Sequence, residues 1–219
     1  MYETLEAEHR KWSFVEAFAV GVALTLVSCA LAWVGTTVGR DFVPAGQGYP
    51  QANEVQRDLF RFDSAYYLDI AEHGYSYNGD PGSSPNIVFA PLFPLSVGAI
   101  AKLTGWSAVD IGFWLNHLLL WGALTLLFSC LRHWFGAWPA LASLFAMATS
   151  AGSYSLHAYY SECAMLFFLA LCLRCVQRRW WFRLALACAF LGASRMAALP
   201  MVLVFSTLLV VRAYNLRKL

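Results

Sequence analysis

A polar stretch at residues 61–75 interrupts an otherwise apolar chain. It reads Arg61-Phe62-Asp63-Ser64-Ala65-Tyr66-Tyr67-Leu68-Asp69-Ile70-Ala71-Glu72-His73-Gly74-Tyr75, with acids, a histidine and tyrosines at roughly helical spacing. A second acidic stretch, His157-Ala158-Tyr159-Tyr160-Ser161-Glu162, lies between two later apolar runs. Because ionisable side chains near lipid are costly, we expect both stretches to serve a function.

The composition around these stretches is that of an integral membrane protein. Of the 219 residues, 59% are hydrophobic and 13% are charged, whereas an ordinary soluble domain has roughly 25% charged residues. No basic patch is interleaved with aromatic residues, so we expect no nucleic-acid partner. The six cysteines all fall in apolar segments, where we interpret them as small buried hydrophobic residues. They are Cys29, Cys130, Cys163, Cys172, Cys175 and Cys188.

Hydropathy predicts a single all-α membrane domain over residues 1–219, with about six transmembrane helices. We expect residues 1–12 to be a cytoplasmic tail, residues 36–110 a large first extracytoplasmic loop with interfacial helices, and residues 111–214 a helical bundle. The predicted spans are Ser13–Gly35, Ile111–Leu131, Trp138–Tyr154, Ala158–Val176, Trp181–Ser194 and Ala197–Tyr214.

The topology depends on a borderline apolar run, Ile87–Thr104, in which Pro91 and Pro94 disfavour a plain helix. If this run lies along the outer surface, ten of the 15 Lys and Arg residues are cytoplasmic; if it spans, only four are. Positive charges gather on the cytoplasmic side, so we predict the non-spanning arrangement. It puts the N-terminus in the cytoplasm and both acidic stretches, together with Arg195, on the extracytoplasmic face.

Asp63 is the candidate catalytic residue. Its carboxylate could act as a general base that takes a proton from a hydroxyl nucleophile. The alternative is a solvated interfacial acid paired with Arg61 or Arg57. His73, near the predicted end of the same helix, could orient a substrate phosphate or hydroxyl, or could cap the helix C-terminus.

The second stretch and a later arginine add further candidates. Glu162 opens a long apolar helix, where an acid gains from the helix dipole, but the preceding Tyr160 and Ser161 suit a sugar-binding wall. Arg195 has no acid within ten positions, so we expect it to be unpaired and able to clamp a phosphate. Snorkelling to lipid headgroups is the alternative for Arg195, and an interhelical hydrogen bond is the alternative for Asn116.

These motifs resemble those of the PIG-V type mannosyltransferases, relatives of the second mannosyltransferase of GPI-anchor synthesis and members of the GT-C superfamily. Residues 61–75 resemble the family signature WD…(Y/F)L.IAE.GY, and residues 86–95, NIVFAPLFPL, resemble its AFFPLYPLL segment. Residues 160–162 match its YSES motif, and residues 193–195 its (T)RS motif. Asn116 stands where the family has an asparagine, and the matches follow the family order.

The resemblance implies a GT-C-like bundle and an inverting transfer of mannose, or a similar hexose, from a polyprenyl or dolichyl monophosphate to an acceptor hydroxyl. Asp63 would be the base, and Arg195 with Arg61 would stabilise the donor phosphate. The residues that would bind substrate are Glu162, Tyr160, Ser161, His73, Tyr67 and Asn116. We expect no cofactor and find no metal-binding spacing, although Asp63 with Glu162 could hold one divalent cation.

The chain also departs from this family. Phe62 replaces the usual tryptophan, and Cys163 replaces the serine that follows the second acid. Full-length relatives carry several further spans, which leaves a natural minimal form, a truncated chain, or half of a two-subunit enzyme whose second subunit supplies the missing helices. The other expected partners are the donor, a lipid- or glycan-linked acceptor and membrane lipids, in a prokaryotic cell membrane rather than the endoplasmic reticulum.

Two alternatives belong to other functional classes. A catalytically silent GT-C-like subunit, lipid carrier or scaffold would keep the fold without the reaction. An intramembrane protease of rhomboid type fits six spans and a Gly-x-Ser sequence ending at Ser194. It needs a base histidine in a later span, however, and every histidine here precedes Ser194.

Overall fold

The computed structural model describes residues 14–39, 54–77, 79–80 and 85–216, and every regular element within these ranges is a helix. The predicted cytoplasmic tail, residues 1–12, lies outside them. The longer helices are α2 (Phe14–Gly39), α5 (Leu92–Thr104), α6 (Ala108–Phe135), α7 (Ala137–Thr149), α9 (Glu162–Arg178), α10 (Trp181–Ser194) and α11 (Leu199–Leu216). The shorter elements are α3 (Glu54–Leu59), α4 (Ser64–His73), η2 (Asn86–Val88), η3 (Ala151–Ser153), α8 (Tyr154–His157) and η4 (Met196–Ala198).

Three of these helices are long and apolar enough to cross a membrane: Phe14–Gly39, Ala108–Phe135 and Met196–Tyr214. A fourth crossing results if Ala151–His157 and Glu162–Arg178, which are bent by 95° at their break, form one broken span. Helices α7 and α10 have 13 and 14 residues, fewer than the roughly 20 that a straight span needs. The predicted all-α class is therefore confirmed for the described residues, and the apolar helices support a multi-pass membrane protein.

Residues 158–161, the first four of the predicted span Ala158–Val176, are not helical, whereas Glu162 begins a helix as predicted. The buried amide of Asn116 donates to the carbonyl oxygens of Leu156 and Ala158 at 3.2 and 2.7 Å. These carbonyls therefore bind a side chain of α6 instead of continuing a helical ladder. Helix α9 starts only at Glu162. Residues 158–161 form a non-helical connection between α8 and α9, which we call the crossing.

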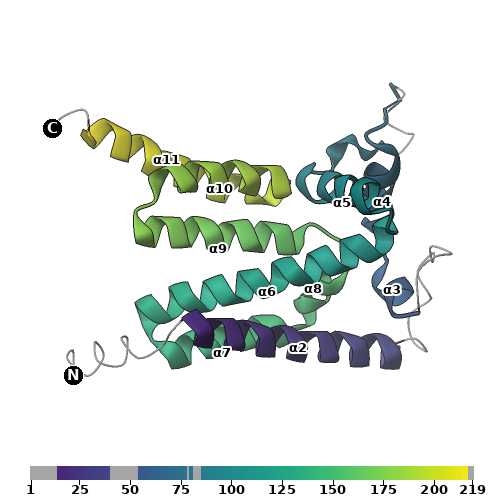
Figure 1. Cartoon of the computed structure of the whole chain (residues 1–219), viewed down its shortest axis with the longest axis horizontal. Helices are drawn as coiled ribbons and strands as arrows, with labels where there is room; N and C mark the ends of the chain where they lie inside the picture. The colour runs from purple at the N-terminus through teal and green to yellow at the C-terminus, as the bar shows by residue number, and fades with distance from the viewer. Residues whose placement is uncertain (1–13, 40–53, 78, 81–84, 217–219) are drawn as a thin grey trace.

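Helix α6 is the centre of the bundle and packs against α2, α7 and α9, while α10 packs between α9 and α11 (Figure 1). Helices α4 and α5 lie across one end of this bundle, beside the start of α6. Helix α2 begins and α11 ends toward the opposite end (Figure 1). The segment rich in acids and tyrosines therefore forms a cap over one end of the bundle, and we call α4 and α5 the end cap.

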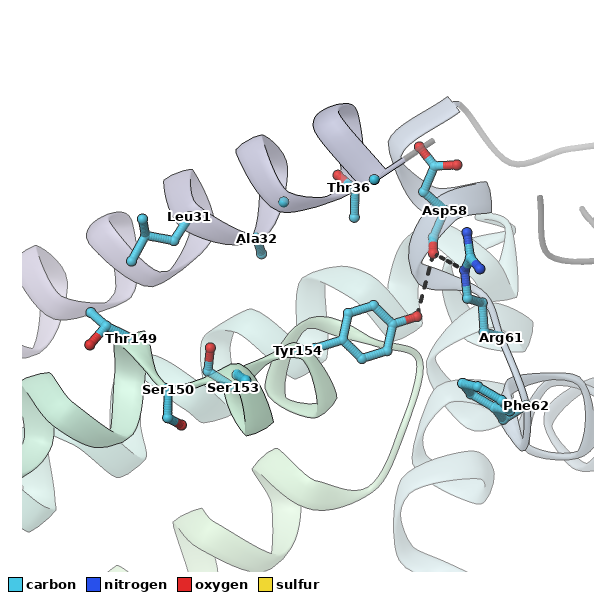
Figure 2. A pocket seen from close by; sticks show the side chains of 13 residues that line it. Leu31, Ala32, Thr36, Asp58, Arg61, Phe62, Thr149, Ser150, Ser153 and Tyr154 are labelled. Carbon is cyan, nitrogen blue, oxygen red and sulfur yellow. Dashed lines mark hydrogen bonds between the residues drawn. The ribbon is translucent and has the colours of Figure 1, made fainter. Parts of the chain in front are cut away.

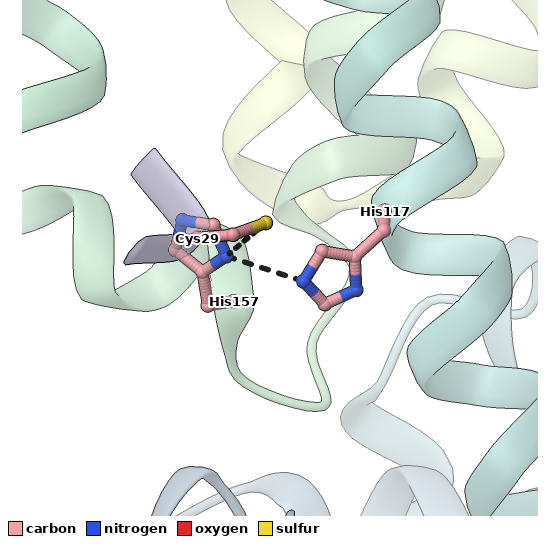
Figure 3. Close-up of side chains that lie close together, drawn as sticks. All are labelled: Cys29, His117 and His157. Atoms are coloured by element: carbon pink, nitrogen blue, oxygen red, sulfur yellow. Dashed lines mark hydrogen bonds between the residues drawn. The ribbon is translucent and has the colours of Figure 1, made fainter. Parts of the chain in front are cut away.

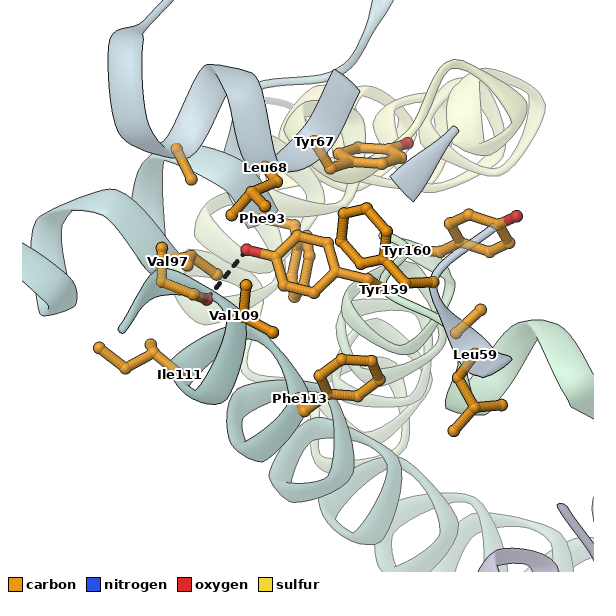
Figure 4. Packing of buried hydrophobic residues seen from close by; sticks show 14 residues of the cluster. Leu59, Tyr67, Leu68, Phe93, Val97, Val109, Ile111, Phe113, Tyr159 and Tyr160 are labelled. Carbon is orange, nitrogen blue, oxygen red and sulfur yellow. Dashed lines mark hydrogen bonds between the residues drawn. The ribbon is translucent and has the colours of Figure 1, made fainter. Parts of the chain in front are cut away.

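An aromatic core fastens the end cap to α6 (Figure 4). The fully buried ring of Tyr159 lies between Phe93 of α5 and Phe113 of α6, with centroid distances of 5.4 and 5.8 Å. Its hydroxyl donates to the carbonyl oxygen of Ala108 at 3.1 Å. A side chain at Gly112 would overlap this ring, so the glycine permits the close approach of the crossing to α6.

Within the end cap, α4 lies directly on α5. Gly98 of α5 faces the backbone of Ala71 so closely that a Cβ atom would overlap the Ala71 carbonyl oxygen. The inner face of α4 buries Tyr67, Leu68 and Ile70, in keeping with the apolar spacing of the opening stretch. This packing leaves the first residue before α4, Asp63, at the edge of the end cap.

Candidate functional site

The central feature of the site is an ion pair between two helix ends. Arg195, directly after α10, places Nη1 2.6 Å from Oε2 of Glu162, the first residue of α9. Their side chains are 33% and 17% exposed, respectively. The prediction that Arg195 is unpaired is therefore wrong, because α9 and α10 pack against each other and bring together an acid and a base that are distant in sequence.

Asp63 occupies the N-cap position of α4, and its carbonyl oxygen accepts hydrogen bonds from the backbone amides of Tyr66 and Tyr67 at 3.1 and 3.2 Å. Its side chain is exposed and makes no ion pair or side-chain hydrogen bond with other described residues, so the predicted alternative of a pair with Arg61 is not formed. Phe62 has a φ of +50°, which is strained for an aromatic residue. The backbone is thus fixed while the Asp63 carboxylate stays accessible.

Tyr67 links the end cap to the second acidic stretch. Its buried hydroxyl lies 2.9 Å from the hydroxyl of Ser161. Burial raises the pKa of Tyr67, while the hydrogen bond to Ser161 and the charge of Arg195 lower it. The charges of Glu162 and Asp63 raise this pKa as well. Because Tyr67 lies in the first turn after Asp63 and Ser161 directly precedes Glu162, this hydrogen bond brings the start of α4 beside the start of α9.

Tyr160 completes this group of residues, since its hydroxyl donates to the carbonyl oxygen of Arg61 at 2.8 Å. We call the following residues the charged cluster: Asp63, Tyr67, Tyr160, Ser161, Glu162 and Arg195. They come from the start of α4, the crossing before α9 and the end of α10. The structure thus brings together six of the nine site residues that the sequence predicts.

The predicted phosphate ligand Arg61 lies beside the charged cluster, in a pocket of about 480 Å³ (Figure 2). One wall is the C-terminal half of α2, and the other consists of residues 149–154. The Arg61 Nε–H donates to the carbonyl oxygen of Asp58 at 2.8 Å, and the Tyr154 hydroxyl donates to the same oxygen at 3.4 Å. The pocket therefore combines mainly apolar walls with the guanidinium of Arg61 and the side chain of Asp58.

His73 lies apart from the charged cluster. It is at the opposite end of the ten-residue helix α4 from Asp63, which is about 15 Å along the helix axis. Its Nδ1 is 3.1 Å from Oδ1 of Asp69, with side chains 70% and 48% exposed, and Asp69 Oδ2 accepts a hydrogen bond from Asn86. His73 is the last residue of α4, but its ring contacts the Asp69 side chain, and the C-cap is Gly74, whose N–H donates to the carbonyl oxygen of Ile70.

Asn116 also lies apart, fully buried in α6. Its amide NH₂ is engaged by the carbonyl oxygens on either side of His157. The alternative interpretation, an interhelical hydrogen bond, therefore describes its geometry. Asn116 orients the backbone of the crossing that carries Tyr160 and Ser161.

Sequence reasoning missed a second polar group, Cys29 with His117 and His157, whose ligand-type atoms lie within 4.8 Å of one another. These residues come from α2, α6 and α8, so no local spacing could have pointed to them. The cysteine prediction holds in part: all six are free thiols and five are buried, but Cys29 is only half-buried.

Comparison of the chain with family models, with curated proteins and with solved structures finds no match. A functional proposal therefore depends on the motif resemblance and on the chemistry of the charged cluster.

Proposed function

We propose that this chain is a GT-C-like glycosyltransferase. It would move mannose, or a similar hexose, with inversion from a polyprenyl or dolichyl monophosphate to an acceptor hydroxyl. The observation that carries this proposal is the meeting of three separate segments: Glu162 pairs with Arg195, and the hydrogen bond between Tyr67 and Ser161 brings the start of α4, which Asp63 precedes, beside that pair. The exposed carboxylate of Asp63 and the guanidinium of Arg195 would supply the base and the anion site that such a transfer requires.

In this proposal Asp63 removes the proton of the acceptor hydroxyl as that oxygen attacks C1 of the sugar. The bond from C1 to the phosphate oxygen breaks, and the phosphate leaves with the bonding electron pair. A positioned general base contributes typically ~10²–10⁴ in rate. The exposed side chain and the fixed backbone of Asp63 suit this role.

Arg195 stabilises the departing phosphate. Its guanidinium has about five N–H donors in a planar fork, and the short contact to Glu162 engages Nη1. Glu162 therefore orients Arg195, and the remaining donors can meet phosphate oxygens. Tyr160 and Ser161 lie beside this pair and supply hydroxyls for the sugar or acceptor, while Arg61 in its apolar-walled pocket suits the phosphate end of a lipid chain.

The proposal includes a topology with the N-terminus in the cytoplasm and the charged cluster outside. Helices α2, α6, α7, α9, α10 and α11 would all cross the membrane, with the shorter α7 and α10 at places where the bilayer thins or where they tilt within the bundle. Two observations support this topology. The positive charges favour it, and the end cap lies opposite the start of α2 and the end of α11.

The test is a transfer assay on the purified full chain in lipid nanodiscs, with polyprenyl-phosphate mannose labelled in the sugar and a membrane glycolipid extract as acceptor. We expect label to appear in a second lipid with inverted anomeric configuration. Asp63→Asn, which keeps the side-chain volume, should lower the rate by about 10²–10⁴ with an unchanged circular dichroism spectrum. The matched control is Asp69→Asn on the same helix, whose carboxylate binds His73 and Asn86, and its rate should stay close to wild type.

Near wild-type transfer by Asp63→Asn would overturn the assignment of the base. Binding of the labelled donor without any transfer, in wild type and variant alike, would favour the silent subunit or lipid carrier.

A further inference from the structure

A second polar group lies inside the bundle, where Cys29 of α2, His117 of α6 and His157 of α8 point toward one another (Figure 3). His157 Nδ1 is 3.3 Å from His117 Nε2 and 3.9 Å from Cys29 Sγ. None of these residues belongs to the charged cluster. Three side chains with metal-ligating atoms, from three different helices, therefore share one small volume.

The hydrogen bonds of His117 define its tautomer. Nδ1 lies 2.7 Å from the carbonyl oxygen of Phe113, and a carbonyl can only accept. Nδ1 therefore carries the proton and donates it to that oxygen. Neutral His117 consequently directs the lone pair of Nε2 at His157.

The hydrogen bonds of His157 define its tautomer in the same way. The hydroxyl of Ser28 donates to the carbonyl oxygen of Ala148 at 2.8 Å, so its proton is already used. The contact of 2.7 Å between Ser28 Oγ and His157 Nε2 then requires Nε2–H to be the donor. This leaves the lone pair of His157 Nδ1 directed at His117, where two acceptors face each other at 3.3 Å. Such a contact is repulsive between two neutral rings and becomes favourable when a metal ion or a proton sits between the two nitrogens.

We propose that Cys29, His117 and His157 bind one Zn²⁺ ion. A tetrahedral ion bound about 2.0–2.1 Å from two nitrogens holds them about 3.3 Å apart, which matches the observed separation. On binding, the Cys29 thiol releases its proton to water and Sγ coordinates the ion as a thiolate. Two imidazoles and a thiolate form a ligand set that Zn²⁺ commonly takes.

The surroundings of the two imidazoles support this site. Histidines that bind metals usually donate their second ring N–H to a carbonyl or another acceptor, which orients the ring. His117 does so to Phe113, and His157 does so to Ser28. Asn116 additionally holds both carbonyls that flank His157. Both rings are thus oriented by neighbours that are independent of the ion.

The site also has a route of entry and room for a fourth ligand. All three residues line a pocket of about 440 Å³ that also contains Gln56 and Asp110. The Gln56 amide donates to Asp110 Oδ1 at 2.9 Å, so a carboxylate stands in the same pocket. A site with three protein ligands and an open fourth position can hold water there. The ion would join α2 to α6 and to α8, the short helix that directly precedes the segment with Tyr160.

The experiment is metal analysis of the full chain, purified without a histidine tag, equilibrated with Zn²⁺ and then dialysed against metal-free buffer. We expect about one Zn²⁺ per wild-type chain and much less in Cys29→Ser and His117→Gln. The matched control is Cys188→Ser, a buried cysteine of α10, which should keep the wild-type content. Ser28→Ala keeps all three ligands but removes an orienting hydrogen bond, and it should weaken affinity about 10–100-fold.

Replacement by Co²⁺ provides a second readout, because a thiolate ligand produces a sulfur-to-cobalt charge-transfer band. This band should be present in wild type and in Cys188→Ser and absent in Cys29→Ser. Wild-type protein that carries no Zn²⁺ and shows no such band would overturn the proposal, as would equal metal content in wild type and in Cys29→Ser. Neither measurement uses sugar transfer, so these experiments test the metal site independently of the proposed enzyme activity.

Discussion

The charged cluster and the cluster of Cys29, His117 and His157 differ in how their polar groups are paired. In the charged cluster, Glu162 and Arg195 neutralise each other at 2.6 Å, and Asp63 directs an exposed carboxylate outward. In the cluster inside the bundle, the hydrogen bonds of neutral His117 and His157 to Phe113 and Ser28 leave each ring with a lone pair directed at the other. The first suits a ligand that brings both hydroxyls and an anion, and the second suits a cation. The difference indicates two separable sites. Each prediction below therefore states the expected effect on transfer or stability and the expected effect on Zn²⁺ content.

After Asp63→Asn, the largest effect on transfer is expected from Arg195→Ala. Removal of a group that stabilises charge in the transition state costs about 10²–10³ in rate, so transfer should fall by this factor while the Zn²⁺ content stays at the wild-type level. Arg195→Lys keeps the charge without the planar fork and should recover only part of the rate. If Arg195→Ala also released the metal, the two clusters would not be separable.

The next effect in size concerns the support of the charged cluster. Gly98→Ala places a Cβ against the Ala71 carbonyl oxygen, and overpacking of this kind costs about 1–3 kcal/mol. The end cap should loosen, with a lower thermal midpoint and weaker transfer, while the metal site keeps its ion. The matched control is Gly35→Ala in α2, where a Cβ meets open space and stability should not decrease. An unchanged midpoint in Gly98→Ala would contradict the close packing of α4 on α5.

Sequence could predict the charged cluster because its members lie at helix ends beside apolar runs. Asp63 and Glu162 lie in polar stretches between apolar runs, and the distribution of Lys and Arg predicts that both stretches lie on the same side of the membrane. The pairing of Glu162 with Arg195 could not be predicted, because it depends on the packing of α9 against α10. The strain at Phe62 likewise arises from the turn between α3 and α4 and has no signature in its residue type.

The cluster inside the bundle was invisible to sequence reasoning for a different reason. His157 lies 128 positions from Cys29 and 40 from His117. The three residues therefore show none of the short spacings by which metal sites are found in a sequence. The start of a helix at Glu162 was predicted and is confirmed, whereas the sequence did not show that the short helix α8 ends at His157 and leaves residues 158–161 non-helical. Only the position of Asn116 on the facing helix, which captures two carbonyl oxygens, explains why the helix ends there.

A smaller effect is expected from Tyr67→Phe, which removes the hydroxyl that lies 2.9 Å from Ser161 Oγ. A typical buried hydrogen bond contributes about 0.5–1.5 kcal/mol, and the fully buried Ser161 hydroxyl would lose this partner. Chemical unfolding should report a loss of about 1 kcal/mol with unchanged metal content. Ser161→Ala in the Tyr67→Phe background should cost little more, because the two variants remove the same bond; additive losses would show that the hydroxyls act separately.

The smallest effect is expected from His73→Gln, which tests whether the C-terminal end of α4 takes part in the substrate site. His73 forms an exposed pair with Asp69 one helical turn away, and such pairs contribute about 0.2–0.5 kcal/mol. Because His73 lies at the end of the helix opposite Asp63, transfer and metal content should both stay close to wild type. The measurement is the rate with labelled polyprenyl-phosphate mannose beside that of Asp63→Asn. A comparable loss in His73→Gln would extend the substrate site along the whole of α4 and restore the role that the sequence suggested for this histidine.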